Sequence, residues 1–170
     1  MLAVRLVAIS GSMQAGSSNR ALLDVADAVA GDDVEVAVFE ALADVPAFNP
    51  DTRPTPAVVN AFRTLVEGAD GLVFATPEYA HGLPGALKNL LDWLVGSGEL
   101  YGKRVVVLSA APSEERGHYA RADLERTLRA QGANVLASVT VAVPTSVRGA
   151  ELDDDTIREA VAGALSAFRD

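Results

Sequence analysis

The sequence contains no cysteine, and this absence excludes disulfide bonds, thiolate catalysis and metal centres with cysteine ligands. It is compatible with a reducing compartment, and we expect a cytoplasmic protein. Residues 1–10 carry an apolar run of about nine residues, which is too short to cross a membrane. No small-residue cleavage site follows this run, so the sequence predicts no signal peptide.

Positive charge is also scarce, since 14 lysine and arginine residues stand against 23 aspartate and glutamate residues, a formal net charge of −9. An acidic surface disfavours nucleic acid and anionic membranes, so we expect neither as a partner. The length of 170 residues, of which 49% are hydrophobic, suits one globular domain with a sizeable core. Because no repeat, low-complexity tract or linker divides the chain, we predict a single domain over residues 1–170.

Strand-like and helix-like patterns alternate along the chain. Apolar runs rich in β-branched residues predict strands at residues 4–9, 34–39, 71–75, 104–110 and 135–143. Helical periodicity predicts helices at residues 19–29, 57–67, 85–95, 120–130 and 153–169. Parallel neighbours need crossover connections, so the alternation predicts a doubly wound α/β sheet. The first, third and fourth strands are almost continuously apolar, which is typical of central strands buried on both faces.

The first predicted strand runs into a loop rich in glycine and serine, residues 10–19, that leads directly into a helix. Glycines let the backbone turn its N–H groups inward, the hydroxyls of Ser12, Ser17 and Ser18 add donors, and the helix N-terminus adds positive potential. Together these features suit a phosphate monoester. Ser17 stands where a P-loop has its lysine, which argues against an NTPase. The alternative is that Ser17 or Ser18 only caps the helix.

Residues 76–94 carry the strongest functional signal in the chain. An apolar strand stops, a seven-residue loop follows, and Pro84 opens an amphipathic helix. Ligands of open parallel sheets bind over the carboxyl ends of strands, beside helix N-termini. With Glu78, Tyr79 and Gly82, this loop is suited to placing its backbone against a flat polar ligand.

The residues that carry this signal are Pro77-Glu78-Tyr79, Gly82, Pro84-Gly85, Leu87-Lys88-Asn89 and Asp92-Trp93. This string resembles the flavin-facing loop of the NADPH-dependent FMN reductase family, a flavodoxin-like group. The resemblance covers residues 4–130 and implies a flavodoxin-like, doubly wound sheet of five parallel strands in the order 2-1-3-4-5, with helices on both faces. It also implies that FMN lies where the loops after strands 1, 3 and 4 converge.

The family typically reads Gly-Ser-x-Arg-x-x-Ser-x-Asn in the first loop, where the Ser, Arg and Asn hold the FMN phosphate. Ser12, Ser17 and Asn19 match this pattern, whereas Gln14 stands where arginine is usual, so a neutral amide replaces a bidentate cation. Arg20 is a nearby residue that could compensate. The resemblance therefore implies phosphate contacts at Ser12, Gln14, Ser17 and Asn19, and the hydroxyl of Ser18 joins them as a further predicted donor.

In the family, residues like Pro77, Glu78, Tyr79 and Gly82 contact the isoalloxazine edge, mainly through backbone groups. The alternative for Glu78 is that its carboxylate accepts a structural hydrogen bond within its own loop. A glycine-rich third loop covers the other side of the flavin in the family, and Ser109 agrees with it. Residues 114–116 replace the small residues expected there.

The resemblance implies an FMN-dependent NAD(P)H oxidoreductase that passes a hydride from nicotinamide to flavin N5 and on to a small acceptor. Quinones, azo compounds, metal oxyanions and free flavins are candidate acceptors, and NADPH and NADH remain open as co-substrates. Because the cofactor carries this chemistry, we name no side chain as catalytic and expect no metal. Two alternatives remain, a flavodoxin-type electron carrier and a flavin-binding module that has lost turnover. Gln14 and the altered third loop motivate the second alternative.

We also expect a homodimer or homotetramer. The second loop and the helix after it supply more apolar surface than one helix face over a sheet requires, at Tyr79, Leu83, Leu87, Leu90, Leu91, Trp93 and Leu94. Residues of this set that are exposed on the monomer would form a patch suited to two-fold pairing. The alternative is burial of the leucines against the sheet alone. We interpret His81 as an exposed loop residue.

Overall fold

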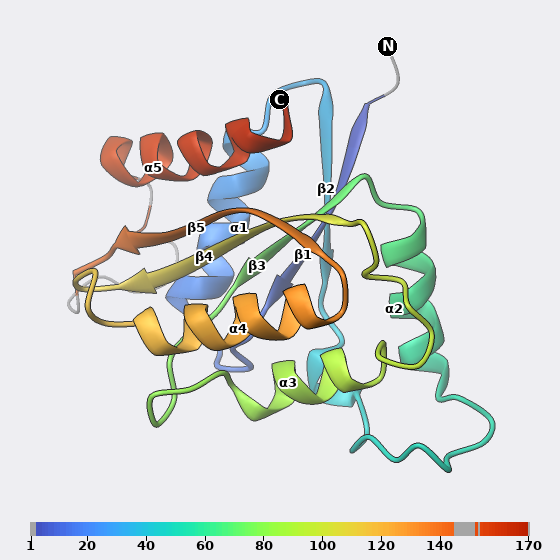
Figure 1. Ribbon diagram of the computed structural model, residues 1–170. Coiled ribbons are helices and arrows are strands. Elements are labelled where there is room, and N and C mark those ends of the chain that lie inside the picture. Colours follow the sequence, from blue (N-terminus) through green and yellow to red (C-terminus); the bar gives the residue numbers. More distant parts are fainter. Residues whose placement is uncertain (1–2, 145–151, 153, 170) are drawn as a thin grey trace.

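The computed structural model describes residues 3–144, 152 and 154–169. Within them, a five-stranded parallel sheet lies between two layers of helices (Figure 1). The strands are β1 (Val4–Ser10), β2 (Val34–Phe39), β3 (Gly71–Ala75), β4 (Arg104–Ala111) and β5 (Asn134–Ala142). Their order is β2-β1-β3-β4-β5, and every neighbouring pair is parallel, which confirms the predicted flavodoxin-like sheet.

The helices are α1 (Ser18–Val29), α2 (Ala57–Glu67), α3 (Gly85–Asp92), α4 (His118–Ala130) and α5 (Asp155–Leu165), with short 3-10 helices at η1 (Leu42–Asp44) and η3 (Ser166–Phe168). Successive residues of a strand point to opposite faces, so each strand serves two cores. Leu6 and Ala8 of β1 pack with α1 and α5, whereas Val7 and Ile9 pack with α2, α3 and α4.

The central strands are the ones that the apolar pattern predicts. All five residues of β3 are buried, and so are most residues of β1 and β4. The edge strands β2 and β5 are mostly half-buried. This difference follows from position, because helices cover both faces of a central strand whereas an edge strand has neighbours on one side only.

Five helix boundaries differ from the prediction. Helix α1 begins at Ser18 instead of residue 19, and helix α5 ends at Leu165 instead of residue 169. Helix α3 ends at Asp92, not at residue 95, and a guanidinium nitrogen of Arg63 binds the carbonyl oxygen of the following residue, Trp93, at 2.6 Å. Helix α4 begins at His118 instead of residue 120, after Gly117 in a left-handed conformation. Helix α5 begins after Asp154, whose carboxylate accepts the N–H of Thr156 at 2.8 Å. The predicted first residue, 153, lies outside the described residues.

The apolar side chains of α3 are covered within one chain. Leu87, Leu90 and Leu91 are fully buried, and Leu94 and Trp93 nearly so. The indole Nε1–H of Trp93 donates to the carbonyl oxygen of Pro46 at 2.9 Å. For these five residues the expectation of an excess apolar surface is therefore wrong, because they pack against the sheet and the connection after β2. Tyr79, from the same expected set, is 52% exposed. In the part of the chain that the structure describes, no helix is long and apolar enough to cross a membrane.

Candidate functional site

The loops that the sequence singles out meet over the carboxyl ends of the strands (Figure 1). They enclose a cavity of about 250 Å³, lined by Ser12, Gln14, Gly16, Ser17, Ser18, Asn19, Pro77, Tyr79, Ala110, Val143 and Pro144. This set includes seven of the ten candidate residues, taken from two loops far apart in the sequence. Glu78, Gly82 and Ser109 are candidates that do not line it. The cavity is thus a shared site of the first and second loops.

The hydroxyl groups of the first loop hold its own backbone in place. The Oγ of Ser10 accepts the N–H of Ser12 at 3.2 Å, and the Oγ of Ser12 accepts the N–H of Gln14 at 3.2 Å. The Oγ of Ser17 accepts the N–H of Arg20 at 3.4 Å and so caps α1. Because a hydroxyl that accepts can still donate, Ser12 and Ser17 keep a donor for a ligand.

Asn19 connects the start of α1 to the end of β4. Its side chain is buried, and Oδ1 accepts the N–H of Ala110 at 2.9 Å, a contact between residues 91 positions apart. The Nδ2 group of the same amide carries two further N–H donors, which this bond does not use. The first N–H groups of a helix have no acceptor within it, and in α1 these include Ser18 and Asn19. Neutral donors therefore gather at this end of the cavity.

None of the described residues that line the cavity carries a charge. Arg20 does not compensate for Gln14, because its guanidinium binds Glu40 and Asp24, each at 2.6 Å. The hydrogen bond with Glu40, followed by that with Asp24, raises the pKa of Arg20 above its ordinary value despite partial burial. The positive potential of the site comes instead from the N-terminus of α1.

The second loop contains a tight turn whose two ends are paired through the backbone. The N–H of Tyr79 donates to the carbonyl of Gly82 at 3.2 Å, and the N–H of Gly82 donates back at 3.0 Å. Ala80 and His81 have φ angles of 51° and 58°, a left-handed conformation that costs about 1–2 kcal/mol per residue without glycine. The turn places Tyr79, with 52% of its surface exposed, at the cavity rim.

The carboxylate of Glu78 points away from the cavity and caps α4. Its Oε2 accepts the N–H groups of Tyr119 and Ala120 at 2.9 and 3.2 Å, at a helix start where Gly117 offers no side chain. Its Oε1 lies 3.3 Å from Nδ1 of His81, whose side chain is 78% exposed, as predicted for an exposed loop residue. The side chain of Glu78 therefore has a structural role, as the alternative expects, although its hydrogen bonds join it to the backbone of α4 and not to its own loop. This leaves only its backbone for a ligand.

The third loop closes over Ser109 at the end of β4. Ser109 is buried, and its Oγ has no hydrogen-bond partner among the described residues. A Cβ atom on Gly117 would lie 2.5 Å from this Oγ, and the φ of Gly117 is 88°, so glycine is required at this close approach. Ser109 is thus a buried neighbour of Ala110, which lines the cavity. Arg121, also buried, holds Glu114 of the third loop at 2.7 Å.

Ala110, Val143 and Pro144 also line the cavity, although no sequence motif indicates them. Their side chains are apolar and offer no hydrogen-bonding group that would mark a binding site in the sequence. The strand order predicts the neighbourhood, because the carboxyl end of β5 must lie beside that of β4. Gly16 belongs to the predicted phosphate loop, and its φ of 70° fits the turn there. The described residues hold no cluster of three or more side chains that could bind a metal ion.

The chain is similar to several flavoenzymes. The sequence model described as NADPH-dependent FMN reductase matches residues 4–148. A quinone reductase of Escherichia coli K12 is 33% identical over 113 residues, which cover 64% of this chain but only 60% of that protein. An NAD(P)H-dependent FMN reductase of Pseudomonas aeruginosa is 29% identical, with 98% of this chain and 94% of that protein covered.

The fold is also that of solved flavoenzyme structures. The NAD(P)H:(acceptor) oxidoreductase of Paracoccus denitrificans superposes with a TM-score of 0.80 at 24% identity, over 97% of this chain and 94% of that one. At this identity the likeness concerns the fold alone. The sequence match extends over most of the chain and includes both loops that form the cavity. The chain belongs to the NADPH-dependent FMN reductase family.

Proposed function

We propose that this chain is an FMN-dependent NAD(P)H oxidoreductase that reduces a small acceptor such as a quinone, an azo compound, a metal oxyanion or a free flavin. One observation carries the proposal. The two loops that resemble the flavin-binding loops of the family form one cavity, beside the N-terminus of α1. The relatives named as quinone reductase and FMN reductase support the same class of reaction.

The first loop is suited to hold the FMN phosphate. Its donors are the hydroxyls of Ser12, Ser17 and Ser18 and the amides of Gln14 and Asn19, together with the free N–H groups at the start of α1. Such a site binds the phosphate through neutral groups and the helix dipole. The guanidinium of Arg20 is paired with the carboxylates of Asp24 and Glu40, so it does not supply a positive charge to the phosphate.

The second loop, which contains Pro77, Glu78, Tyr79 and Gly82, is suited to hold the isoalloxazine ring. Pro77 and Tyr79 line the cavity, and Glu78 and Gly82 lie next to them in the loop. The capping bond from Glu78 to α4 and the paired turn at Tyr79 fix the backbone of this loop before a ligand arrives. Bound FMN supplies the chemistry, since a flavin can accept a hydride from a nicotinamide and pass it on. The residues of the chain position the reactants and exclude water.

The absorbance spectrum of the purified protein, followed by NADPH and NADH oxidation with a quinone, tests the proposal. We expect flavin absorbance and steady oxidation of at least one nicotinamide that depends on the acceptor. A protein that binds no added FMN contradicts the proposal. A flavin-loaded protein that nicotinamides do not reduce points to an electron carrier or a module without turnover.

We further propose a cytoplasmic, single-domain homo-oligomer, either a dimer or a tetramer. Since the leucines of α3 are buried, the proposal rests on exposed aromatic residues of the second loop and the first turn of α4. Tyr79 and Tyr119 are 52% and 53% exposed, and the rings of His81 and Tyr119 lie 5.1 Å apart. Light scattering at micromolar concentration tests it, and a peak at the chain mass of 17.7 kDa with full reductase activity would contradict it.

A further inference from the structure

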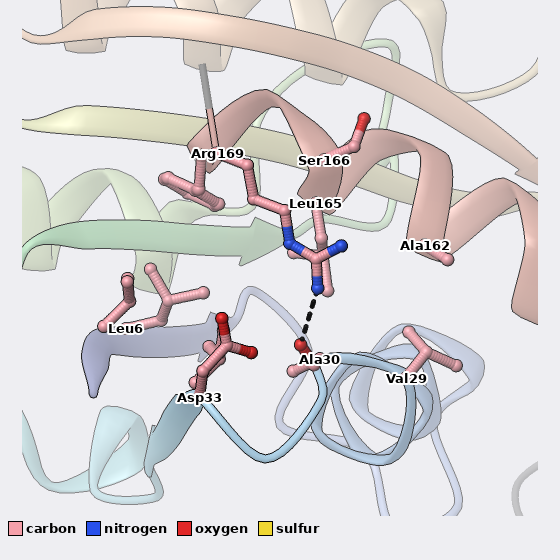
Figure 2. Close-up of a pocket in the computed structure, with 11 residues that line it drawn as sticks. Leu6, Val29, Ala30, Asp33, Ala162, Leu165, Ser166 and Arg169 are labelled. Carbon is pink, nitrogen blue, oxygen red and sulfur yellow. Dashed lines mark hydrogen bonds between the residues drawn. The ribbon is translucent and has the colours of Figure 1, made fainter. Parts of the chain in front are cut away.

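A second cavity lies at the amino ends of β1 and β2, at the opposite end of the sheet from the proposed flavin site. It has a volume of about 420 Å³ and lies between the C-terminus of α1 and the segment α5–η3. Figure 2 shows Leu6, Val29, Ala30 and Leu165 around it, which make most of its wall apolar. A volume of this size is in the range of small-molecule sites.

The wall of this cavity is held rigidly at Phe168. A Cβ atom on Gly71 would lie 2.4 Å from Cε1 of Phe168, so the ring rests directly on the β3 backbone. The guanidinium of Arg104 donates to the carbonyl oxygens of Phe168 and Ala167, both at 2.8 Å, and stacks over the ring of Phe168. The cavity is therefore a feature of the packed fold.

Two charged side chains line the solvent-exposed edge of this cavity, one of each sign. The guanidinium of Arg169 reaches across it and donates to the carbonyl oxygen of Ala30 at 3.2 Å, as Figure 2 shows. The carboxylate of Asp33 points into the same space from the start of β2. Among the described residues, no ion pair joins Asp33 to Arg169. Arg169 therefore keeps N–H donors for a ligand, and Asp33 keeps carboxylate oxygens that can accept.

These charges select the chemistry of a ligand. A carboxylate would pair with Arg169 but be repelled by Asp33, and an amine would meet the opposite conflict. An uncharged group with a carbonyl and an N–H side by side satisfies both residues, because the carbonyl accepts from Arg169 and the N–H donates to Asp33. A carboxamide and a cyclic imide have this arrangement.

We propose that the cavity between α1, β2 and α5–η3 is a second binding site for an uncharged carboxamide or cyclic imide carried on an apolar ring body. The two sites lie at opposite ends of β1, whose 7 residues rise by roughly 3.3 Å each. The ligand therefore lies about 20 Å from the proposed flavin site. The site does not rest on the proposed function.

The test uses three naphthalene probes of similar size on the protein as purified, namely 2-naphthamide, 2-naphthoate and 2-naphthylmethylamine. Backbone amide NMR shifts report where each probe binds. We expect 2-naphthamide to bind at least tenfold more tightly than either charged probe and to shift residues 29–34 and 162–169. Asp33→Asn should raise the affinity for 2-naphthoate, and Arg169→Gln should raise that for the amine. Asp32→Asn, a change next to the cavity, is the matched control.

A variant that fills the cavity provides the second measurement. Ala162 lines the cavity from the exposed side of α5, so Ala162→Phe should abolish binding while the protein remains folded. Equal affinities for the three probes, or a preference unchanged in Asp33→Asn and Arg169→Gln, would overturn the proposal. So would the absence of any shift, or shifts confined to the loops at residues 10–19 and 76–84.

Discussion

The carboxylate of Glu78 accepts the backbone N–H of Tyr119 at 2.9 Å, across 41 positions of the sequence. This bond joins the loop after β3 to the first turn of α4, where Gly117 cannot cap the helix itself. Two of the three loops at the proposed flavin site are thereby fixed to each other. Glu78 is a positioning residue of the site, acting through a helix cap.

Removing this cap should destabilise the protein. Glu78→Ala leaves the N–H groups of Tyr119 and Ala120 without their acceptor, and loss of a helix cap costs about 1 kcal/mol. Glu78→Gln keeps an acceptor oxygen and should retain most of the stability. Urea unfolding of the three proteins measures the difference. Equal unfolding free energies for the wild type and Glu78→Ala would show that the cap contributes nothing.

Asn19→Asp should weaken FMN binding selectively. The aspartate keeps the oxygen that accepts from Ala110, but it loses the Nδ2 donors and places a negative charge beside the phosphate. We expect FMN affinity to fall by about 1–3 kcal/mol, as for a lost charge-assisted contact. Riboflavin, which has no phosphate, should bind the variant as it binds the wild type. An equal loss for both flavins in a fluorescence titration would place the phosphate elsewhere.

Gln14→Arg should tighten FMN binding, because residue 14 lines the cavity and no described lining residue is cationic. The expected gain is on the order of 1 kcal/mol for a partly screened pair. The gain should shrink as salt is added and should be absent for riboflavin. An affinity that does not change, or a gain that salt does not reduce, would mean that the side chain points away from the phosphate.

Two glycine-to-alanine changes should act in opposite directions. At Gly71 the new Cβ would meet Cε1 of Phe168 at 2.4 Å, so Gly71→Ala should destabilise by about 1–3 kcal/mol through overpacking. At Gly163, in helix α5, nothing lies within 4 Å of the new atom, so Gly163→Ala should stabilise by about 0.5–1 kcal/mol. Thermal unfolding followed by circular dichroism compares the two, and a stable Gly71→Ala protein would contradict the packing of Phe168.

The pattern of residues determined the elements and their layering. The bounds of β2, β3 and α2 agree with the sequence prediction, and the continuous apolar runs identify β1, β3 and β4 as central strands. Such local periodicity reflects which face of an element is buried, so it can be read without the fold. The glycine and serine residues of the first loop likewise indicated the helix start at Ser18, and the phosphate site next to it stays a prediction.

Only the tertiary structure decided which partners the polar and charged side chains take. Arg20 binds Glu40, Glu78 caps α4, and Asn19 holds β4, all through contacts between residues distant in the sequence. It also decided that Leu87 and Leu91 are buried in the monomer, where helical spacing alone left an interface open. The reason is that periodicity specifies an apolar face, whereas the atoms that cover this face, or satisfy a donor, are fixed only when the strands are placed side by side.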